Sequence, residues 1–370
     1  MQDRIHPERL QALPERMATA GQLGFGFDEG LLAMAAEAAA ARLRKPKAVK
    51  TPRPVATEPV ALTPAAAGDS PEAMAQALER HPDYRVLRRL VPATAFAHAP
   101  LGPVATVVIL DTETTGLDAS RDQVIELALL RIQVDTQTGL ATGPVQVYDG
   151  LRDPGMPVPK IAREITGITD EMLAGQQLDM ARVDSLLAGA DLVIAHNAGF
   201  DRPFVEGLLP QAQGLNWACS FADIDWTAAG HSSAKLSYLA SALGWFYDAH
   251  RAEMDCHALL TVLTAELPGL GVNGLAHLLA AARLPSYRLQ ATGAPFAAKD
   301  SLKNRGYRWD STAKVWHTRL GGDTALQAEC EWLRQEVYGG RAARLAWERF
   351  DAASRYSGRA GVPGWAQLGT

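Results

Sequence analysis

Apolar positions in the middle of the chain fall into short continuous runs separated by amphipathic stretches. Val104 to Leu110 reads VATVVIL, a β-branched apolar run typical of a buried strand. Three further strands are predicted, at 124–134, 144–151 and 191–195. Helical periodicity lies between and after them, at 171–187, 203–209, 236–243 and 253–267. Strands interspersed with helices in this way indicate an α/β sheet covered by helices.

The rest of the chain has a different pattern on each side of this region. Residues 1–100 are rich in Ala and Pro, with a polyproline-like linker at 45–64 and helical stretches at 29–43 and 71–90, so we expect a partly disordered N-terminal region. We assign the main domain to 101–268 and an apolar connecting helix to 269–285. Beyond it, helices at 297–304 and 324–338 and strands at 306–309 and 315–320 predict a small α+β module over 286–350, followed by a tail at 351–370.

Charge is segregated between these two units. Residues 104–268 hold 22 Asp and Glu against 9 Lys and Arg, a net charge of −13, whereas residues 286–350 hold 11 Lys and Arg against 7 acids, a net charge of +4. The acidic unit should repel nucleic acid unless cations screen some of its carboxylates. The basic unit is a candidate nucleic-acid-binding module.

Composition excludes several classes of protein. The 370 residues contain no apolar run long enough to span a membrane and no apolar secretory stretch near the N-terminus. The three cysteines are widely separated and lack metal-site spacing, which argues against a disulfide scaffold or a zinc site. We therefore expect a cytoplasmic protein without a membrane partner.

The first strand runs directly into two acids. Side chains alternate along an extended segment, so Asp111 and Glu113 point the same way at the end of this strand. Two carboxylates aimed together repel unless one is protonated or a cation lies between them, and Mg²⁺ prefers such oxygen ligands. The alternative is a hydrophilic strand end followed by helix-capping threonines.

Two later segments repeat this arrangement. The buried strand at 191–195 leads into HNAGFD, which ends in Asp201, and the segment HRAEMD carries His250 and Asp255 at the start of the last long helix of the domain. Taken singly, Asp201 could be a helix N-cap, His250 a surface histidine and Asp255 a solvated helix position. The three segments in this order favour one shared site.

The run DTETTG, then HNAGFD, then H-x-A-x-x-D resembles the DEDDh-type 3′→5′ exonucleases, the DnaQ-like family that includes the epsilon subunit of DNA polymerase III. The likeness covers about residues 104–268 and extends to 165–173 and 235–239. It implies a ribonuclease H-like fold, with a mixed five-stranded sheet flanked by helices. Histidine stands five residues before the last acid, and Arg251 occupies the position where the tyrosine subgroup has its tyrosine.

The resemblance also implies a mechanism. Two divalent cations, Mg²⁺ or Mn²⁺, would be held by four acids: Asp111, Glu113, Asp201 and Asp255. His250 would be the general base, since an imidazole accepts a proton near neutral pH. By the same resemblance, Thr114 would contact the terminal 3′-hydroxyl and Leu117 would pack against the terminal base. Asn197 would hydrogen-bond near the scissile end, or would instead orient the loop before the third acid.

The basic module interleaves cations with aromatic residues between Lys299 and Trp309 and again between Lys314 and His317. Such a surface can stack bases and attract phosphates. Trp309 and Trp316 could instead form the core of the module, which does not exclude nucleic-acid binding by its basic face.

Together these features predict a metal-dependent 3′→5′ exonuclease of the proofreading or repair type, acting at 3′ ends of DNA. Its partners would be single-stranded or 3′-ended nucleic acid, with DNA favoured over RNA, and a DNA polymerase or replisome protein. An RNA-trimming exoribonuclease shares every catalytic residue and stays an alternative. A non-catalytic nucleic-acid-binding or replisome scaffold protein on the same fold is the other alternative.

Overall fold

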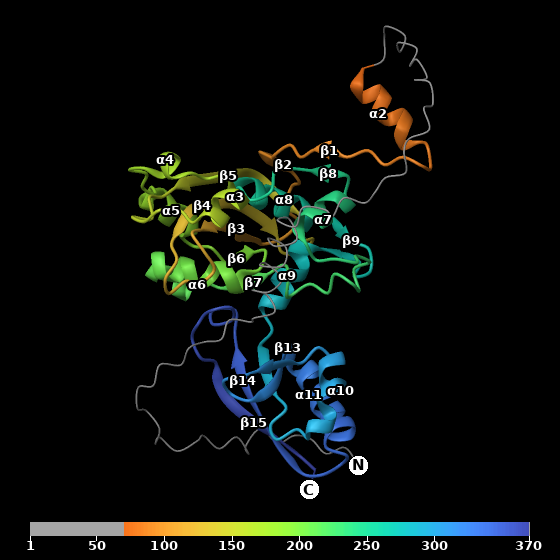
Figure 1. Ribbon diagram of the computed structural model, residues 1–370. Helices are drawn as coiled ribbons and strands as arrows, with labels where there is room; N and C mark the ends of the chain where they lie inside the picture. The colour runs from red at the N-terminus through yellow and green to blue at the C-terminus, as the bar shows by residue number, and fades with distance from the viewer. Residues whose placement is uncertain (1–69, 370) are drawn as a thin grey trace, which may run out of the picture.

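The computed structural model of the protein describes residues 70–369 (Figure 1). The predicted linker at 45–64 and helix at 29–43 lie outside the described residues. Helix α2 (Pro71–Glu79) begins as expected, with Ser70 Oγ accepting the N–H of Ala73 at 3.2 Å. It ends well before the predicted boundary, because residues 88–89 form strand β1, which pairs with β8 (Trp245–Phe246). Within the described part of the chain, no helix is both long and apolar enough to cross a membrane.

A six-stranded mixed sheet forms the centre of the main domain, in the order β2-β5-β4-β3-β6-β7. Its strands are β2 (Ala95–Ala97), β3 (Val104–Thr114), β4 (Val124–Asp135), β5 (Ala141–Leu151), β6 (Leu192–Ala195) and β7 (Trp217–Cys219). β3, β4 and β5 are antiparallel neighbours, and β6 and β7 run parallel to β3. The ribonuclease H-like fold is confirmed. The sheet has six strands and not the five that the resemblance implied: the four strands predicted from the sequence are present, and β2, which pairs with β5, and β7, which pairs with β6, were not predicted.

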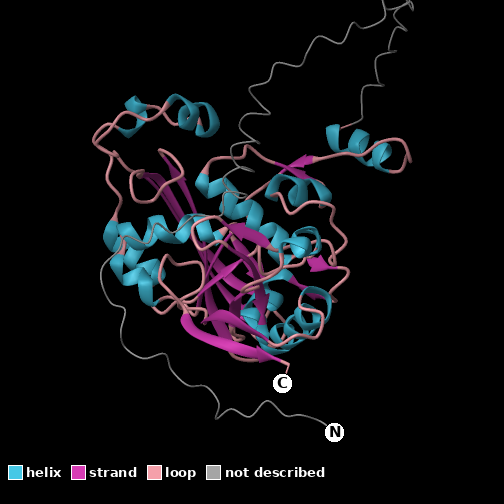
Figure 2. Ribbon diagram, turned by 60° about the horizontal axis from the view of Figure 1, so that its bottom comes forward, coloured by secondary structure: helices cyan, strands magenta, loops and turns pink. Residues whose placement is uncertain are grey.

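Helices cover both faces of this sheet, with the strands inside (Figure 2). One face packs against α7 (Leu236–Ala242), α8 (Ala252–Thr264) and α9 (Gly274–Ala282), and the other against α5 (Met180–Leu187) and α6 (Ala198–Leu208). Two short helices, α3 (Lys160–Thr166) and α4 (Asp170–Leu173), lie in the β5–α5 connection, and α9 is joined to α8 through the short pair β9 (Glu266–Leu267) and β10 (Val272–Asn273). The single helix predicted over 171–187 is thus split into α4 and α5, with Gly175 between them in a left-handed conformation (φ 72°).

The alternation of side chains along β3 decides which layer each of its last residues faces. Val107 and Ile109 belong to the core under α8, whereas Val108 and Leu110 belong to the core under α6. The same alternation directs Asp111 and Glu113 toward the α8 layer and Thr112 toward the α6 layer. The end of β3 can therefore collect side chains from both layers.

The C-terminal module is a five-stranded antiparallel sheet in the order β12-β13-β11-β14-β15. It comprises β11 (Ser286–Gln290), α10 (Lys299–Asn304), β12 (Arg308–Asp310), β13 (Val315–Gly321), α11 (Gly322–Trp332), a π-helical turn (Leu333–Val337), β14 (Ala343–Phe350) and β15 (Val362–Leu368). The predicted tail at 351–370 is wrong, because β15 pairs with β14 along seven positions. This edge strand was not predicted because its sequence contains Pro363 and Gly364, and proline and glycine are depleted in strands. The predicted connecting helix at 269–285 corresponds to α9, which packs into the core of the main domain.

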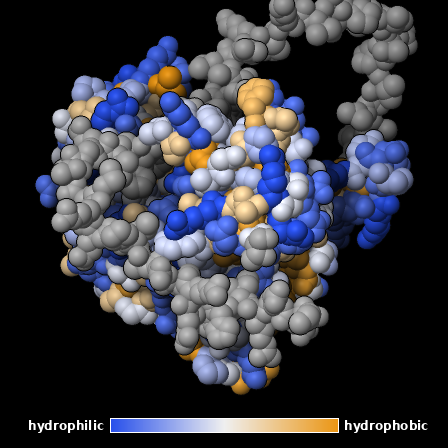
Figure 3. All heavy atoms as spheres, turned by 90° about the horizontal axis from the view of Figure 1, so that it is seen from below, coloured by the Kyte–Doolittle hydropathy of each residue, from blue (hydrophilic) through white to orange (hydrophobic). Residues whose placement is uncertain are grey.

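The two tryptophans of the module differ in their surroundings. Trp316 packs against the buried cluster under α10 and α11, as the core interpretation requires. Trp309 contacts Trp316 with ring centroids 5.6 Å apart but is 51% exposed, so the core interpretation fails for it. Seen from below, the molecule shows hydrophilic residues interspersed with apolar ones (Figure 3).

The β14–β15 loop (residues 351–361) joins the module to the main domain through Arg202, whose side chain is fully buried in α6. Arg202 donates to the carbonyl oxygens of Ala353 and Arg355, both at 2.6 Å, and to Glu206 Oε1 at 2.7 Å. The N–H of Trp217 on the edge strand β7 donates to the carbonyl of Ala352 at 2.8 Å. The loop therefore covers the edge of the main sheet and satisfies a buried charge at the same time.

We predict that Arg202→Met destabilises the full chain by about 3 kcal/mol, the cost typical of removing one partner from a buried ionic network. The substitution leaves the loop carbonyls without their donor, although Arg359 still reaches Glu206 at 3.2 Å. Urea unfolding measures the effect. The control is Arg182→Met on the exposed face of α5, and equal midpoints for the two variants would contradict the prediction.

Candidate active site

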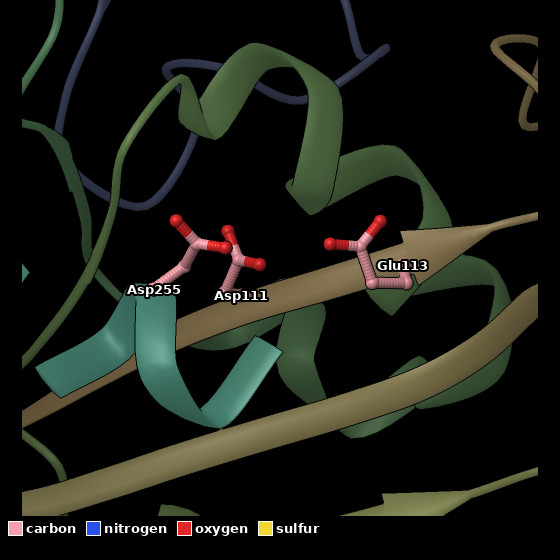
Figure 4. Close-up of side chains that lie close together, drawn as sticks. All are labelled: Asp111, Glu113 and Asp255. Atoms are coloured by element: carbon pink, nitrogen blue, oxygen red, sulfur yellow. The ribbon is translucent and has the colours of Figure 1, made fainter. Parts of the chain in front are cut away.

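Three of the four acids predicted to bind metal meet at the end of β3. Asp111 and Glu113 come from β3 and Asp255 from the first turn of α8, and a carboxylate oxygen of each lies within 4.8 Å of the others. Figure 4 shows the carboxylates of Asp111 and Asp255 side by side and that of Glu113 rising from the same strand. All three are partly buried. Such a group of hard oxygen atoms has the composition of a divalent-cation site.

Asp201 reaches this site from the opposite layer. It lies in the first turn of α6 and is 2% exposed, and its Oδ1 accepts the N–H and the hydroxyl of Thr112 at 3.1 and 2.8 Å. Because Thr112 faces the α6 layer, Asp201 approaches from the side of β3 opposite α8. Thr112 lies between Asp111 and Glu113 on β3, so these bonds place Asp201 beside the three-acid group, although it is not part of that group. Among the neighbouring acids, Asp201 contributes most to the raised pKa of Asp111.

Burial and mutual repulsion hold these acids toward their protonated forms. Burial first, and then the charges of Asp201, Asp255 and neighbouring acids, raise the pKa of Asp111 and of Glu113 well above the ordinary values. Burial also raises the pKa of Asp201 to about 7, against the hydrogen bonds from Thr112. Four ionised carboxylates are therefore unfavourable here until positive charge is supplied.

His250 lies immediately before α8 with a left-handed backbone (φ 70°), a conformation that is uncommon for residues other than glycine. Its N–H donates to Asp255 Oδ2 at 2.7 Å, and its charged form lowers the pKa of Asp255. The predicted histidine is thus adjacent to the predicted last acid. Asn197, at the N-cap of α6, is the other predicted site residue with a left-handed backbone (φ 83°).

Two structural supports of Asp255 were not predicted from the sequence. The hydroxyl of Tyr247 donates to Asp255 Oδ1 at 2.8 Å. Glu126 on β4, fully buried and in register with Glu113, accepts from Arg251 Nη2 at 2.7 Å and from the N–H of Ala252 at 2.9 Å. These bonds fix the start of α8, where both Asp255 and His250 are placed.

One of these supports left a trace in the sequence. Glu126 interrupts the apolar run VIELALL of a predicted buried strand, and a lone acid in such a run needs a partner. Nothing local to Tyr247 distinguishes it from a surface tyrosine. Its role depends on the turn between β8 and α8, which brings it back to Asp255.

The predicted substrate contacts follow the acids on β3. A β-bulge between Glu113 and Thr114 ends the regular pairing with β4. Thr114 is buried and its hydroxyl donates to the carbonyl of Gly116 at 2.5 Å, whereas Leu117 is 41% exposed. A Cβ at Gly116 would lie 2.4 Å from a carboxylate oxygen of Asp122, so a larger residue would displace the carboxylate that accepts the N–H of Asp118 at 2.9 Å. The exposed Leu117 is thus held by a tight turn close to the acids.

The main domain also resembles known proteins in sequence. The exonuclease family model matches residues 108–263. A PolC-type DNA polymerase III of Thermotoga petrophila is 36% identical over 121 residues, which are 32% of this chain and 8% of that protein. A DNA polymerase III subunit epsilon-like protein of Rhodobacter capsulatus is 33% identical over 115 residues, 30% of this chain and 16% of that protein. The chain thus spans less than a fifth of the length of these relatives.

Among solved structures, exonuclease I of E. coli in complex with a dA16 oligonucleotide covers 61% of this chain and 67% of its own, at a TM-score of 0.40 and 15% identity. The family match includes β3 with its acids, the HNAGFD segment and the start of α8. Residues 108–263 thus match the exonuclease family in sequence, and this stretch contains the acids and the histidine of the DEDDh pattern.

Proposed function

We propose that this protein is a metal-dependent 3′→5′ exonuclease that removes nucleotides from the 3′ ends of DNA. The observation that carries the proposal is the convergence of Asp111, Glu113 and Asp255, with Asp201 beside them, at the end of the central strand of an exonuclease-family domain. DNA is favoured because the relatives that match this domain are DNA polymerases III. The same relatives support a DNA polymerase as a partner.

The four acids fit a pair of divalent cations, Mg²⁺ or Mn²⁺. Burial and mutual repulsion raise the pKa values of these acids, and hard cations bound to their carboxylate oxygens would favour the ionised forms. Asp111, Glu113 and Asp255, with Asp201 beside them, would hold these ions. Bound there, the ions would neutralise the phosphate and lower the pKa of the attacking water.

The chain's own residues would supply the remaining chemistry. His250, held beside Asp255 by its backbone N–H, would accept the proton of the attacking water on a ring nitrogen. Tyr247 and the N–H of His250 keep Asp255 oriented and favour its ionised form. Attack on the phosphorus then breaks the bond to the 3′ oxygen of the preceding nucleotide, which leaves with that strand.

The same geometry suggests how the 3′ end is held. Leu117 is exposed next to the acids and would pack against the terminal base. The hydroxyl of Thr114, which donates to Gly116 in this structure, would turn to the terminal 3′-hydroxyl. Asn197 sits between β6 and Asp201, where its amide would reach the scissile end.

We predict that Asp111→Asn lowers Mg²⁺-dependent degradation of a 5′-labelled DNA strand by more than about 100-fold, since even partners of metal ligands cost 10–100-fold when removed. Asp184→Asn, on the exposed side of α5, is the control. Matched DNA and RNA strands with free and blocked 3′ ends test polarity and sugar preference in the same assay. Undiminished degradation by the Asp111 variant would show that Asp111 is not an active-site residue.

A second prediction concerns stability. Asp201 binds its proton up to about pH 7 in the folded protein, against 3.8 ordinarily, so between these values the folded state holds protons that the unfolded state has lost. Without metal, stability therefore falls as pH rises through this window. Mg²⁺ binds the ionised acids, so its thermal stabilisation should be larger at about pH 8 than at about pH 5. Equal melting shifts at both pH values would contradict this.

A third prediction isolates a supporting residue. Tyr247→Phe removes a donor that favours the ionised form of Asp255, so the Mg²⁺ concentration for half-maximal activity should rise by about 10-fold. The rate at saturating Mg²⁺ should change far less. Tyr238→Phe, which removes only a hydroxyl contact with Ser232, is the control. A loss of rate that no Mg²⁺ concentration restores would show that Tyr247 acts on the chemistry instead.

A further inference from the structure

The sheet of the C-terminal module has one face covered by helices and one face without them. Leu289, Leu345 and Leu368 pack against α10 and the π-helical turn, in the buried cluster of the module. Because side chains alternate along strands, the intervening residues point to the other side. We call that side the outer face; the basic residues on it are Arg288, Arg308, Arg319 and Arg344.

Register places these cations together. Arg288 on β11 is paired with Arg319 on β13 and with Glu348 on β14. Arg344 follows Glu348 at an even spacing on the same strand and so shares its face. Arg288 is held by Asp310 at 2.7 Å and Glu348 at 3.7 Å, whereas Arg319 and Arg344 are exposed. Arg308 on β12 is exposed as well, so the outer face presents three exposed guanidinium groups around Arg288, which the two acids hold in place.

Two of the exposed arginines, Arg319 and Arg344, each lie over an aromatic ring. The guanidinium carbon of Arg344 is 3.9 Å from the centroid of a Trp365 ring, and that of Arg319 is 5.7 Å from the ring of Tyr356. A guanidinium stacked in this way is oriented while its in-plane N–H groups stay available for a phosphate. Arginines beside aromatic rings are the elements with which proteins bind single-stranded nucleic acid.

Tyr356 links this face to the active site. β3, β6 and β7 are parallel, so Asp111, the HNAGFD segment and Asp223 lie along one edge of the main sheet. The Tyr356 hydroxyl donates to Asp223, and its ring lies 4.0 Å from the position that a Cβ on Gly199 would take, two residues before Asp201. Tyr356 therefore lies beside the edge of the main sheet that carries the acids, and Arg319 lies next to Tyr356 on the side of the module.

The β14–β15 loop fixes the outer face in this position. It supplies Tyr356, whose backbone is left-handed (φ 66°), and the carbonyls that receive Arg202. Asp201 and Arg202 are neighbours on α6, so the residue next to a catalytic acid carries the attachment of the module. In Figure 1, β13 and β14 accordingly lie directly beneath α6 and β7. The outer face and the active site are thus connected through the β14–β15 loop.

We propose that the outer face binds single-stranded DNA on the 5′ side of the nucleotide in the active site, with Arg319 and Arg344 contacting phosphates and Trp365 available to a base. This inference rests on the proposed function, since it assumes that the 3′ end lies at the acids. Charge favours this occupant: residues 104–268 carry a net charge of −13 and repel a strand, whereas residues 286–350 carry +4.

The test compares binding of dT20 and dT4 to the full-length protein in EDTA, by fluorescence anisotropy. The double variant Arg319→Ala/Arg344→Ala should bind dT20 about 10-fold more weakly and dT4 nearly unchanged. Its plot of log affinity against log salt should lose about 1.4 units of slope, about 0.7 for each phosphate contact on a single strand. Trp365→Ala should weaken dT20 binding with the salt slope retained, because stacking releases no counterions.

The matched control is Lys299→Ala/Lys303→Ala, which removes two exposed cations from α10 on the helix-covered side of the same module. It should leave dT20 binding within about twofold of the unsubstituted protein. Equal losses in the two double variants would show a general charge effect and overturn the proposal. Wild-type binding of dT20 no tighter than of dT4 would also overturn it and favour a protein partner for this face.

These measurements use no hydrolysis, so they separate this inference from the proposed activity. If the wild-type protein degrades no DNA but the Arg319/Arg344 variant binds dT20 more weakly, the binding surface is supported and the proposed nuclease activity is refuted. If the wild-type protein degrades DNA and the variant binds dT20 with unchanged affinity, the nuclease activity is supported and the binding surface is refuted.

Discussion

Repulsion among acids at the end of one strand is the constraint around which this domain is organised. Asp111 and Glu113 share a face of β3, and Asp255 on α8 lies on the same side. Asp201 on α6 approaches from the opposite side of β3. Such a group opposes folding unless protons or cations accompany it. The domain holds it together with directed donors: Thr112 to Asp201, and Tyr247 and the N–H of His250 to Asp255.

Those donors depend on a second set of contacts further from the acids. Glu126 is fully buried and takes the guanidinium of Arg251 and the first free N–H of α8. The helix carrying Asp255 is thus anchored by an ion pair on the neighbouring strand. On the other side, Arg202 anchors α6 to the loop of the C-terminal module. Each helix that contributes an acid therefore has its own charged attachment.

Much of this could be read from the sequence because the site is built from strand ends. Apolar β-branched runs predicted β3 and β6, and an acid beyond each is a local signal. The long helix predicted over 171–187 was wrong because Gly175 breaks it. In the two large sheets, the strands β2, β7, β11, β14 and β15 were missed, since they are stabilised by pairing with distant segments and carry little local preference. Tyr247 was missed for the same reason.

The placement of Asp201 and Arg202 has a consequence for the evolution of this chain. One peptide bond separates Asp201, proposed here as a metal ligand, from Arg202, which holds the β14–β15 loop. Replacing the C-terminal unit with an unrelated one would remove the loop carbonyls that accept from this buried guanidinium and leave it Glu206 as its charged partner. Such an exchange would therefore need a compensating change at Arg202.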